Sequence, residues 1–542
     1  MQNKKLFLWA LTSALAGFLF GFDTVVISGA EQKIQSVWAL TPFLHGLAMS
    51  SALWGTVLGS LIGGWPTEKL GRRITLLWIG VLYVLSGVGS GLAPDSITFM
   101  IARFIGGIGI GAATVASPLY ISEISPPERR GHLAGLFQFN IVFGILVGFA
   151  SNFLLAKYVD PNIAWRWMLG ISAIPALVYT LMCFSLPESP RWLISHAGRR
   201  QEGMDAFRVI NPGFSEAQIT ELADSVESSM GDRTKAAKLF TWRLRVPIML
   251  AFLIAFFNQL SGINAILYFA PRIFEWTGLG QQAALLNSVG IGITNLIFTY
   301  VGLWLIDRLG RRTLLYIGSF GYIISLGLCS WAFFHWAPQF KVAFTASSLI
   351  EMVEKSGKAA ADPKVDAADR AKLAEGYAKA KTELVKASAD PRYTPGTVAI
   401  SDQSGEADVK KVAEATMATA SSAAGFGGKM VMLCIFAFIA SHAIGQGTVI
   451  WVLISEIFPN RNRASGQALG SFTHWFFCAS LTFVFPMMVS ALVVDVFAPS
   501  AIFGFFCFMM VLQLVWVKTM VPETKGVPLE EMQAKLGIAD ES

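Results

Sequence analysis

The chain has 542 residues, of which 54% are hydrophobic and 14% are charged, and its formal net charge is +6. So high an apolar content exceeds the needs of a soluble core, so the composition excludes an ordinary soluble domain and indicates a membrane protein. The positive charge calls for no nucleic-acid partner, because Lys and Arg gather in short segments between apolar stretches, as they do beside a bilayer.

Apolar stretches of roughly 20 residues, the length that crosses a bilayer core, follow one another along the chain. In the first half they lie near 6–29, 46–67, 74–93, 97–121, 133–155 and 166–186. In the second half they lie near 246–270, 282–306, 313–335, 429–454, 464–491 and 499–521. The first stretch is too long for a signal-peptide core and lacks a small-residue cleavage site, so an uncleaved helix is expected. The sequence predicts an all-α protein with twelve transmembrane helices.

Clustered basic residues predict the orientation of these helices. The clusters all fall on one side of the predicted bundle: Lys4 and Lys5, "EKLGRR" (68–73), "PPERRG" (126–131), the polar stretch 187–245, "DRLGRR" (307–312) and "PNRNR" (459–463). By the positive-inside rule that side is cytoplasmic, so both termini are expected there, in a cell membrane such as a bacterial inner membrane. The five cysteines lie within predicted spans at no metal-ligand spacing and are interpreted as packing residues.

Three motif pairs recur in the same order and indicate an internal repeat. They are "EKLGRRITLL" (68) with "DRLGRRTLLY" (307), "SEISPPERRG" (122) with "SEIFPNRNRASG" (455), and "PESPRWL" (187) with "PETKG" (522). The first two motifs lie much farther apart in the second half than in the first, whereas the last two keep their spacing. The halves therefore match except for one insertion, which corresponds to the polar segment 336–428 on the predicted outer face.

Two six-helix halves in parallel repeat are the architecture of the major facilitator transporters, in which substrate binds near the bilayer midplane between the halves. "GRR" after the second and eighth spans, "PESPRWL", "PETKG", "QFNIVFG" (138–144) and "NQLSGINAILYFAP" (258–271) resemble the motifs of the sugar porter family. The resemblance covers nearly the whole chain outside the insertion, and it is closest to bacterial proton-coupled monosaccharide symporters. It implies an N-terminal bundle (1–193), a cytoplasmic helical linker (194–245), a C-terminal bundle in two parts (246–335 and 429–526), a periplasmic or extracellular insertion (336–428) between the ninth and tenth helices, and a cytoplasmic tail (527–542).

One carboxylate, Asp23, lies inside the otherwise apolar or small stretch "GFLFGFDTVVISGA" (17–30). At 1.5 Å per residue, Asp23 and Arg103 both lie about 9 Å from the outer ends of their predicted helices, so their depths match. A permanent structural salt bridge is one interpretation, and a protonatable acid whose partner changes during transport is the other. The resemblance favours the second, because proton-coupled sugar porters have an Asp at this position. Protons are then the coupling ion, and no other cofactor or metal is expected.

The same helix rise places three uncharged amides and one indole near mid-bilayer. They are Asn258, Gln259, Asn295 and Trp475. Amides offer donors and acceptors together, and an aromatic face packs against the C–H side of a pyranose, so this set suits a small neutral sugar. The substrate-binding residues that the resemblance implies are Phe20, Gln138, Asn258, Gln259, Asn264, Tyr268, Asn295, Gly447, Trp451, His474 and Trp475. Each polar residue could instead form a structural interhelical hydrogen bond, and His474 could be a satisfied interior histidine.

Glycines are expected to interrupt the seventh and tenth helices at "LSGINA" (260–265) and "AIGQGTVIW" (443–451), unless they serve only close helix packing. Acids and bases recur at the predicted cytoplasmic helix ends of both halves, where they can pair between the bundles. The resemblance implies a cytoplasmic gate made of Arg72, Arg73, Glu123, Arg130, Glu188, Arg191, Arg311, Arg312, Glu456 and Arg463. A solvated charged rim is the alternative.

The insertion is rich in Ala, Lys, Asp and Glu, and its stretch 369–387 consists of good helix formers. An ordered helical decoration is expected, with a loose loop or a partner-binding module as alternatives. No nucleophile, metal or phosphate-cradling motif is present, so an enzyme is not expected. The sequence predicts a proton-coupled importer of a neutral monosaccharide, a hexose such as glucose or a pentose such as xylose, that functions as a monomer. A facilitative sugar or polyol uniporter and a non-transporting sugar sensor on the same fold are the alternatives.

Overall fold

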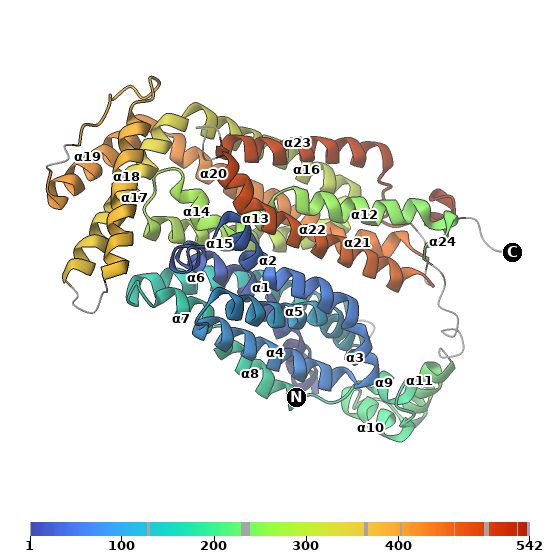
Figure 1. Ribbon diagram of the computed structural model, residues 1–542. Coiled ribbons are helices and arrows are strands. Elements are labelled where there is room, and N and C mark those ends of the chain that lie inside the picture. Colours follow the sequence, from blue (N-terminus) through green and yellow to red (C-terminus); the bar gives the residue numbers. More distant parts are fainter. Residues whose placement is uncertain are drawn as a thin grey trace.

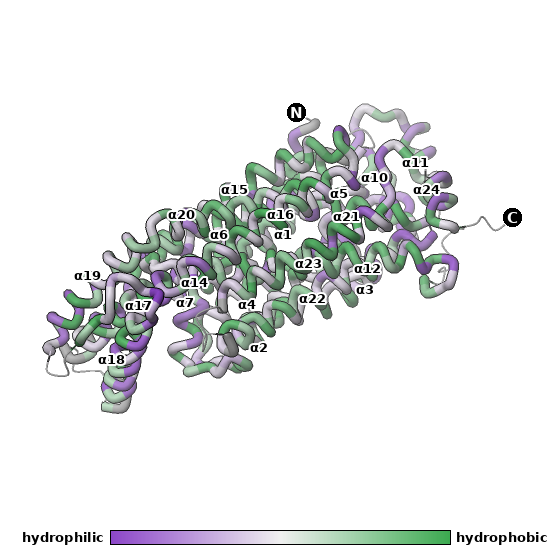
Figure 2. Tube along the Cα trace, turned by 90° about the horizontal axis from the view of Figure 1, so that it is seen from above, coloured by the Kyte–Doolittle hydropathy of each residue, from purple (hydrophilic) through white to green (hydrophobic). Residues whose placement is uncertain are grey.

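The computed structural model describes residues 2–126, 130–228, 239–361, 367–400, 404–459, 461–492, 498–527 and 529–538. Within these ranges every regular element is helical and no strand occurs. The long helices run side by side in an elongated bundle (Figure 1). Hydrophobic residues predominate along the middle of the bundle, and hydrophilic residues gather at its two ends (Figure 2). This distribution is the one expected of a chain that crosses a bilayer.

The helices of the first half are α1 (Gln2–Val37), α2 (Pro42–Ile62), α3 (Gly64–Lys69), α4 (Arg72–Leu92), α5 (Ser96–Ile124), α6 (Arg130–Tyr158), α7 (Ala164–Gly170) and α8 (Ala173–Cys183). Those between the halves are α9 (Pro190–Ser195), α10 (Arg200–Ile210), α11 (Glu216–Ser228) and the 3-10 turn η3 (Trp242–Leu244). The second half comprises α12 (Arg245–Leu260), α13 (Ile263–Tyr268), α14 (Ala270–Glu275), α15 (Gln281–Leu309), α16 (Arg311–His335), α20 (Gly427–Ile444), α21 (Gln446–Ile457), α22 (Arg463–Leu492) and α23 (Ala498–Met520). The predicted insertion contains α17 (Ala337–Ala361), α18 (Ala367–Ser388) and α19 (Glu406–Ala424), and α24 (Leu529–Lys535) follows α23.

Eleven helical segments in the described ranges are long and apolar enough to span a membrane. The predicted span 46–67 corresponds to α2, which is not among the eleven. His45 and a series of small polar side chains lower the hydropathy of α2, and these residues are buried against protein rather than exposed to lipid. α2 packs between α5 of its own half and α22 of the other half, so its polar positions need not contact hydrocarbon.

Both predicted helix breaks are confirmed. α12 ends at Leu260, and Gly262 adopts a left-handed φ of 87° before α13 begins. A side chain at Gly262 would also collide with the ring of Phe506, since a Cβ there would lie 2.5 Å from Phe506 Cδ2. Gly445 separates α20 from α21 with a different backbone conformation, at a φ of -83° and a ψ of -105°. The breaks expose backbone groups and side chains at mid-bundle, where a binding cavity can use them.

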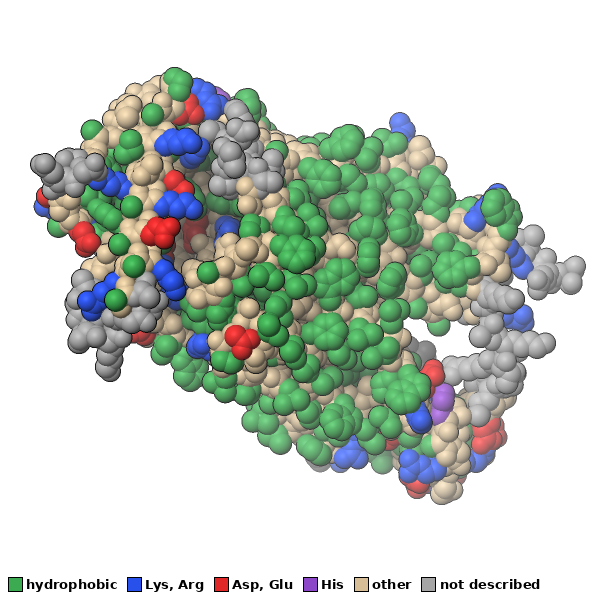
Figure 3. Space-filling model, in the orientation of Figure 1, with side chains coloured by type: hydrophobic (Ala, Val, Ile, Leu, Met, Phe, Trp, Pro, Cys, Tyr) green, Lys and Arg blue, Asp and Glu red, His purple; other side chains and the backbone are tan. Residues whose placement is uncertain are grey.

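The two halves approach each other most closely toward the end of the bundle that carries α17–α19, here called the insertion end. A Cβ atom on Gly46 of α2 would lie 2.0 Å from the carbonyl oxygen of Phe483 on α22, so only glycine permits this approach. At the same end Phe43 packs edge-on against Phe483 with ring centroids 5.2 Å apart. Figure 3 shows the halves parting at the opposite end, at the right of the view, where Figure 1 labels α9–α11 on one side and α24 on the other. We call this opposite end the terminus end.

The insertion helices form a layer of their own at the insertion end (Figure 1). α17 packs against both α18 and α19 around a small apolar core that includes Leu349, Leu384 and Val409. Lys410 Nζ on α19 contacts Glu354 Oε1 on α17 at 2.7 Å, so the outer part of the insertion begins and ends at neighbouring points. The first turns of α17 belong to the body of the protein, because Phe340 packs against Phe333 of α16.

We predict that replacing residues 350–411 by a Gly/Ser linker of about six residues leaves the bundle folded, because the linker spans a short gap and the removed residues lie in the insertion layer rather than in the bundle. The deletion protein should elute as a single symmetric peak in detergent and melt within a few degrees of the parent. A matched deletion that also removes Ala337–Leu349, which packs on the body, should be clearly less stable. Aggregation of the first deletion protein would show that the insertion is part of the core.

Candidate functional site

Asp23 on α1 and Arg103 on α5 form an ion pair inside the first half. Arg103 Nη1 donates to Asp23 Oδ1 at 2.5 Å, and Arg103 Nη2 donates to the backbone carbonyl of Asp23 at 3.2 Å. Each residue is only 2% exposed. The structure thus brings together the two residues whose depths the sequence matched. Asp23 Oδ2 and Arg103 Nε have no hydrogen-bond partner among the described residues, so the pair retains unused polar atoms.

The break between α12 and α13 gathers the predicted amides. Because Gly262 turns the chain, Asn264 points back and its Nδ2 donates to Gln259 Oε1 at 2.6 Å. Gln259 Nε2 in turn donates to Asn258 Oδ1 at 2.8 Å and lies 3.2 Å from the ring nitrogens of His474 on α22. Asn258 and Gln259 are buried, whereas Asn264 and His474 are half-buried. The result is a connected set of uncharged donors and acceptors at mid-bundle.

Aromatic rings from both halves lie beside this amide cluster. Phe20 of α1 packs edge-on against Trp475 of α22 with centroids 5.4 Å apart. His474 lies between Trp451 and Trp475, with centroid separations of 5.2 and 4.8 Å. The indole N–H of Trp475 is buried without a hydrogen-bond partner among the described residues. An unused donor next to amides and ring faces is suited to a polar, uncharged ligand.

The other predicted sugar-contacting residues are more dispersed. Tyr268 is fully buried on α13, Gln138 is half-buried on α6, and Asn295 is buried on α15, where its Oδ1 accepts from Thr299 Oγ1 at 3.4 Å. Gly447 on α21 faces the His442 ring, and a Cβ there would lie 3.2 Å from His442 Cδ2. The hydrogen bonds described for the amide cluster do not extend to Gln138 or Asn295.

At the terminus end, the predicted gate residues pair within each half rather than between the halves. In the first half Arg72 makes a two-pronged contact with Glu123, at 2.8 and 2.9 Å. In the second half Arg311 makes the equivalent contact with Glu456, at 2.8 and 3.1 Å. The expectation of pairing between the bundles is therefore not met in this conformation, because the halves are parted at this end.

A carboxylate that the sequence analysis missed completes the second-half cluster. Glu188 accepts hydrogen bonds from the backbone N–H groups of Arg72 and Arg73, and Glu523 accepts from those of Arg311 and Arg312. The repeated "PES" and "PET" motifs contained the signal for Glu523, because they place it opposite Glu188 in the repeat. Burial raises the pKa of the Glu188 carboxyl, against the lowering effect of these backbone donors and of the Arg72 guanidinium.

Three further gate residues were predicted from the sequence, namely Arg130, Arg191 and Arg463. Arg191 is exposed on α9, and Arg463 is half-buried at the start of α22, where it lines a small polar recess with Glu456 and Thr524. The side chain of Arg130 lies outside the described residues.

A family model described as "Sugar (and other) transporter" matches residues 9–349 and 412–536. The chain belongs to this family of sugar transporters. The unmatched residues 350–411 fall within α17–α19, which agrees with the insertion being an addition to the family fold. Family membership makes the chain a multi-pass membrane transporter rather than an enzyme. The five cysteines are free thiols.

Several relatives of this sugar transporter match over almost their whole length. It is 29% identical to an arabinose-proton symporter of Bacillus subtilis over 96% of this chain and 93% of the relative. It is 28% identical to a D-xylose-proton symporter of Escherichia coli K12, over 98% and 96% of the two chains. It is 32% identical to a probable inositol transporter 2 of Arabidopsis thaliana, over 99% and 92%. These similarities support transport of a sugar or polyol.

Solved structures of the xylose transporter XylE from E. coli share the fold of this sugar transporter. Its inward open conformation matches with a TM-score of 0.69 at 27% identity, covering 98% of this chain and 99% of XylE. XylE bound to 6-bromo-6-deoxy-D-glucose matches with a TM-score of 0.66 at 27% identity, covering 99% and 100%.

The structure contains a second buried charge cluster, at the insertion end, that sequence reasoning missed. Glu31 Oε1 of α1 lies 2.8 Å from Arg272 Nη2 of α14 and 3.0 Å from His45 Nε2 of α2. Arg272 also donates to Gln35 Oε1 at 2.6 Å, and Gln32 donates to Glu275 Oε2 at 2.7 Å. The predicted spans ended at 29 and 270, just short of Glu31 and Arg272, so neither residue was considered intramembrane. These contacts join the two halves across the closed end.

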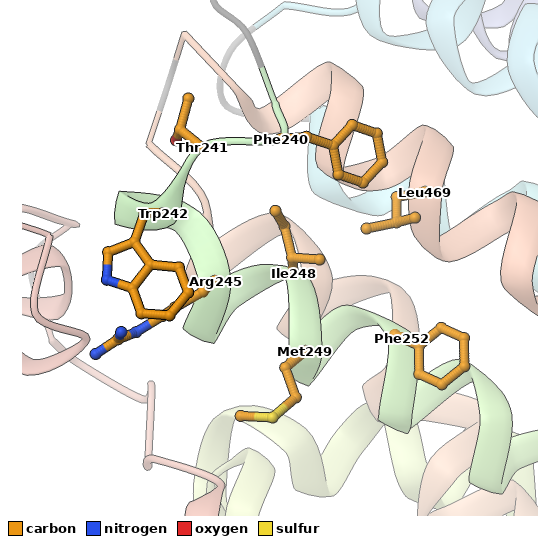
Figure 4. Close-up of a pocket in the computed structure, with 8 residues that line it drawn as sticks. All are labelled: Phe240, Thr241, Trp242, Arg245, Ile248, Met249, Phe252 and Leu469. Carbon is orange, nitrogen blue, oxygen red and sulfur yellow. The ribbon is translucent and has the colours of Figure 1, made fainter.

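A shallow apolar groove lies at the start of α12 (Figure 4), whereas the amide cluster lies at the other end of this helix. It has a volume of about 460 Å³ and is lined by Phe240, Trp242, Ile248, Met249, Phe252 and Leu469, with Thr241 and Arg245. The Arg245 guanidinium lies over the Trp242 ring at 4.3 Å. Exposed Trp with Arg at a helix end is typical of the membrane interface, so the groove is not a sugar site.

We predict that Glu31→Gln opens the insertion end of this sugar transporter, because it removes the negative charge that holds Arg272 and His45. Spin labels on exposed Ser36 and Gln281, one in each half, should show a larger long-distance population in the variant. Glu351→Gln, which changes an exposed carboxylate at the same end, serves as the matched control and should leave the distances unchanged. An unaltered distance distribution in Glu31→Gln would show that the cluster does not hold this end closed.

Proposed function

We propose that this chain is a proton-coupled symporter that imports a neutral monosaccharide by alternating access. The observation that carries the proposal is the buried ion pair of Asp23 and Arg103. A carboxylate at that depth must be paired or neutral, because an isolated buried charge is costly. Loading and release of a proton at Asp23 therefore change its contact with Arg103. The proton is the coupling ion, and no other cofactor is part of the proposal.

The proposed coupling runs along α1. Protonation of Asp23 removes the charge attraction of its 2.5 Å contact with Arg103 and so loosens α1 from α5. Phe20 lies three residues earlier on the same face of α1 and contacts Trp475 of the second half. A shift of α1 at Asp23 would therefore also move Phe20 and change its contact with Trp475, which lies beside the amide cluster. Proton and sugar then bias one conformational equilibrium.

A neutral sugar is favoured because the gathered groups are uncharged. Asn258, Gln259 and Asn264 offer amide donors and acceptors, and Trp451 and Trp475 offer ring faces. The relatives' names include arabinose, xylose and inositol, and we propose a pentose such as xylose or a hexose such as glucose. A facilitative carrier of an inositol-like polyol is the second candidate, which the 32% identity to the plant inositol transporter favours.

The direction of transport follows from orientation. With the terminus end in the cytoplasm, as the basic clusters predict, the conformation described here opens inward and is closed outward. Sugar and proton would leave toward the cytoplasm from this state. The terminus-end clusters of Arg72, Arg311 and their carboxylate partners are proposed to re-pair between the halves when the protein opens outward. We propose that the monomer is the functional unit, with a sugar and the bilayer as its partners.

We predict that Ala at Gln259, Gln138 or Asn295 weakens sugar binding by about 1–3 kcal/mol, because a sugar hydroxyl loses its partner in a buried site. Titration calorimetry of each purified variant with xylose, glucose and myo-inositol measures this loss. Gln201→Ala, on the exposed surface of α10, is the matched control and should bind as the parent does. If all three variants bind sugar as tightly as the parent, the assignment of these residues to the sugar site is wrong.

We predict that Asp23→Asn abolishes accumulation of sugar against its gradient while sugar binding and sugar-for-sugar exchange persist. Asn keeps the shape of the protonated acid but cannot titrate. The measurement is uptake of labelled sugar into proteoliposomes with and without an inward proton gradient, with Asp224→Asn on exposed α11 as control. If the Asp23→Asn variant still concentrates sugar when the gradient is imposed, Asp23 is a structural acid and the symport proposal fails.

A further inference from the structure

Three hydroxyl groups lie in a row inside the first half, on one face of α4. Tyr83, Ser86 and Ser90 follow the helical spacing that places side chains above one another, and they are 4%, 1% and 0% exposed. None of the three hydroxyls has a hydrogen-bond partner among the described residues. Buried serines on helices commonly donate to the carbonyl one turn back, as Ser51 does to Ala48. The α4 hydroxyls are therefore oriented for another partner.

This row lies beside the Asp23–Arg103 ion pair. Asp23 and Arg103 are the charged groups that act on the Tyr83 hydroxyl, and Tyr179 on α8, which also interacts with Cys183, is its titratable neighbour. Ser86 faces α5 one turn from Arg103, since a Cβ on Gly106 would lie 2.3 Å from Ser86 Oγ. Asp23 Oδ2 and Arg103 Nε are themselves unpaired. Unused polar atoms from α1, α4 and α5 are thus buried in the same part of the first half.

The internal repeat provides a comparison within the same chain. Aligning "GRR" of the two halves places Tyr322 opposite Tyr83 and Ser325 opposite Ser86. In the second half both hydroxyls are satisfied, because Tyr322 Oη lies 2.7 Å from His442 Nδ1 and Ser325 donates to the Gly321 carbonyl at 2.7 Å. Aligning "SEI" places Phe436 opposite Arg103. The same side chains are therefore unpaired in the half that contains the carboxylate and paired in the half that lacks the ion pair.

We propose that Tyr83, Ser86 and Ser90 form a proton-exchange path for Asp23 that runs through the first half, separate from the sugar site. The proposal rests on the proposed proton coupling. α4 runs from the terminus end to the insertion end, and seven residues of helix cover about 10 Å, so the row leads from the ion pair toward the insertion end. Ser90 lies two residues before the end of α4. The bound species at this site is water, held between the hydroxyls and Asp23 Oδ2.

The proton step conserves atoms and charge. Tyr83 and Asp23 do not hydrogen-bond each other directly, so the proposed step places a water between them. The bridging water gives a proton to Asp23 Oδ2 and takes one from Tyr83 Oη, and Tyr83 Oη takes one from a hydronium ion on the side of Ser86. The hydronium becomes water, the phenol and the bridging water are restored, and the net change is one proton added to Asp23. The sugar is not involved in this transfer.

The decisive variant is Tyr83→Phe, which removes the hydroxyl and keeps the ring. The parent and variant in proteoliposomes are compared by two rates: sugar accumulation driven by an imposed proton gradient, and sugar counterflow without a gradient. We expect the ratio of accumulation to counterflow to fall about tenfold or more, because a positioned proton-transfer group is removed. A merely structural hydroxyl would alter both rates together. Tyr322→Phe, the repeat-related change in the second half, should leave the ratio at the parental value.

Ser86→Ala tests the same path without altering the aromatic ring, and it decides the matter should Tyr83→Phe fail to assemble in the membrane. A parental ratio in Tyr83→Phe, or in Ser86→Ala where it replaces that variant, overturns the path. Asp23→Asn separates this failure from a failure of the proposed function. If Asp23→Asn abolishes accumulation while the hydroxyl variants keep it, coupling stands and the path is wrong. If Asp23→Asn itself accumulates sugar, both proposals fall.

Discussion

The buried ion pair of Asp23 and Arg103 is the constraint on which the first half depends. Two charges that are nearly inaccessible to water can remain ionised only while each compensates the other, so α1 and α5 must stay in register at this point. The same requirement places Phe20, one turn away on α1, against Trp475 of the opposite half. Asp23 is therefore only one helical turn from a contact between the halves, so a change in its ionisation acts close to that contact. A neutral residue at position 23 would remove that link and leave the buried Arg103 guanidinium without its counter-charge.

The two ends of the bundle use charge differently, and this difference defines the conformation. At the insertion end, Glu31 contacts Arg272 across the halves. Burial strengthens the Coulomb attraction of this pair because little water screens it. At the terminus end, Arg72 and Arg311 contact carboxylates of their own half, so nothing in these clusters draws the halves together. A transporter that alternates must exchange these patterns, and each cluster has carboxylates and guanidinium groups suited to either arrangement. The insertion lies over the end that is closed in this structure.

The internal repeat explains why the terminus-end clusters look alike and why the buried polar groups do not. Gly71 and Gly310 both adopt left-handed φ values, of 97° and 90°, and a Cβ at either would lie 2.5 Å from a carboxylate oxygen of Glu188 or Glu523. The helix-start geometry is thus the same in both halves. Tyr83 and Tyr322 diverge because their surroundings diverge: His442 satisfies the second, whereas the first lies near an ion pair with unused atoms. The repeated motifs form the same backbone arrangement in both halves. Because the residues around them differ between the halves, repeat-related side chains such as Tyr83 and Tyr322 have different partners.

Much of this protein was predictable from sequence. The length of an apolar run marks a transmembrane helix, and the helix rise per residue gives the depth of each residue in the bilayer. Eleven of the twelve predicted spans, the helix breaks at Gly262 and Gly445, the family and the matched depths of Asp23 and Arg103 all followed from one-dimensional patterns. What the sequence did not contain was which charges meet across the halves. Glu31 and Arg272 lie far apart along the chain and just beyond the apolar runs, and Glu523 was visible only as a repeat partner of Glu188. The open terminus end and the unpaired hydroxyls of α4 were decided by tertiary structure alone, since the first depends on how the two halves are tilted and the second on how α4 packs within its own half, and no local pattern encodes either.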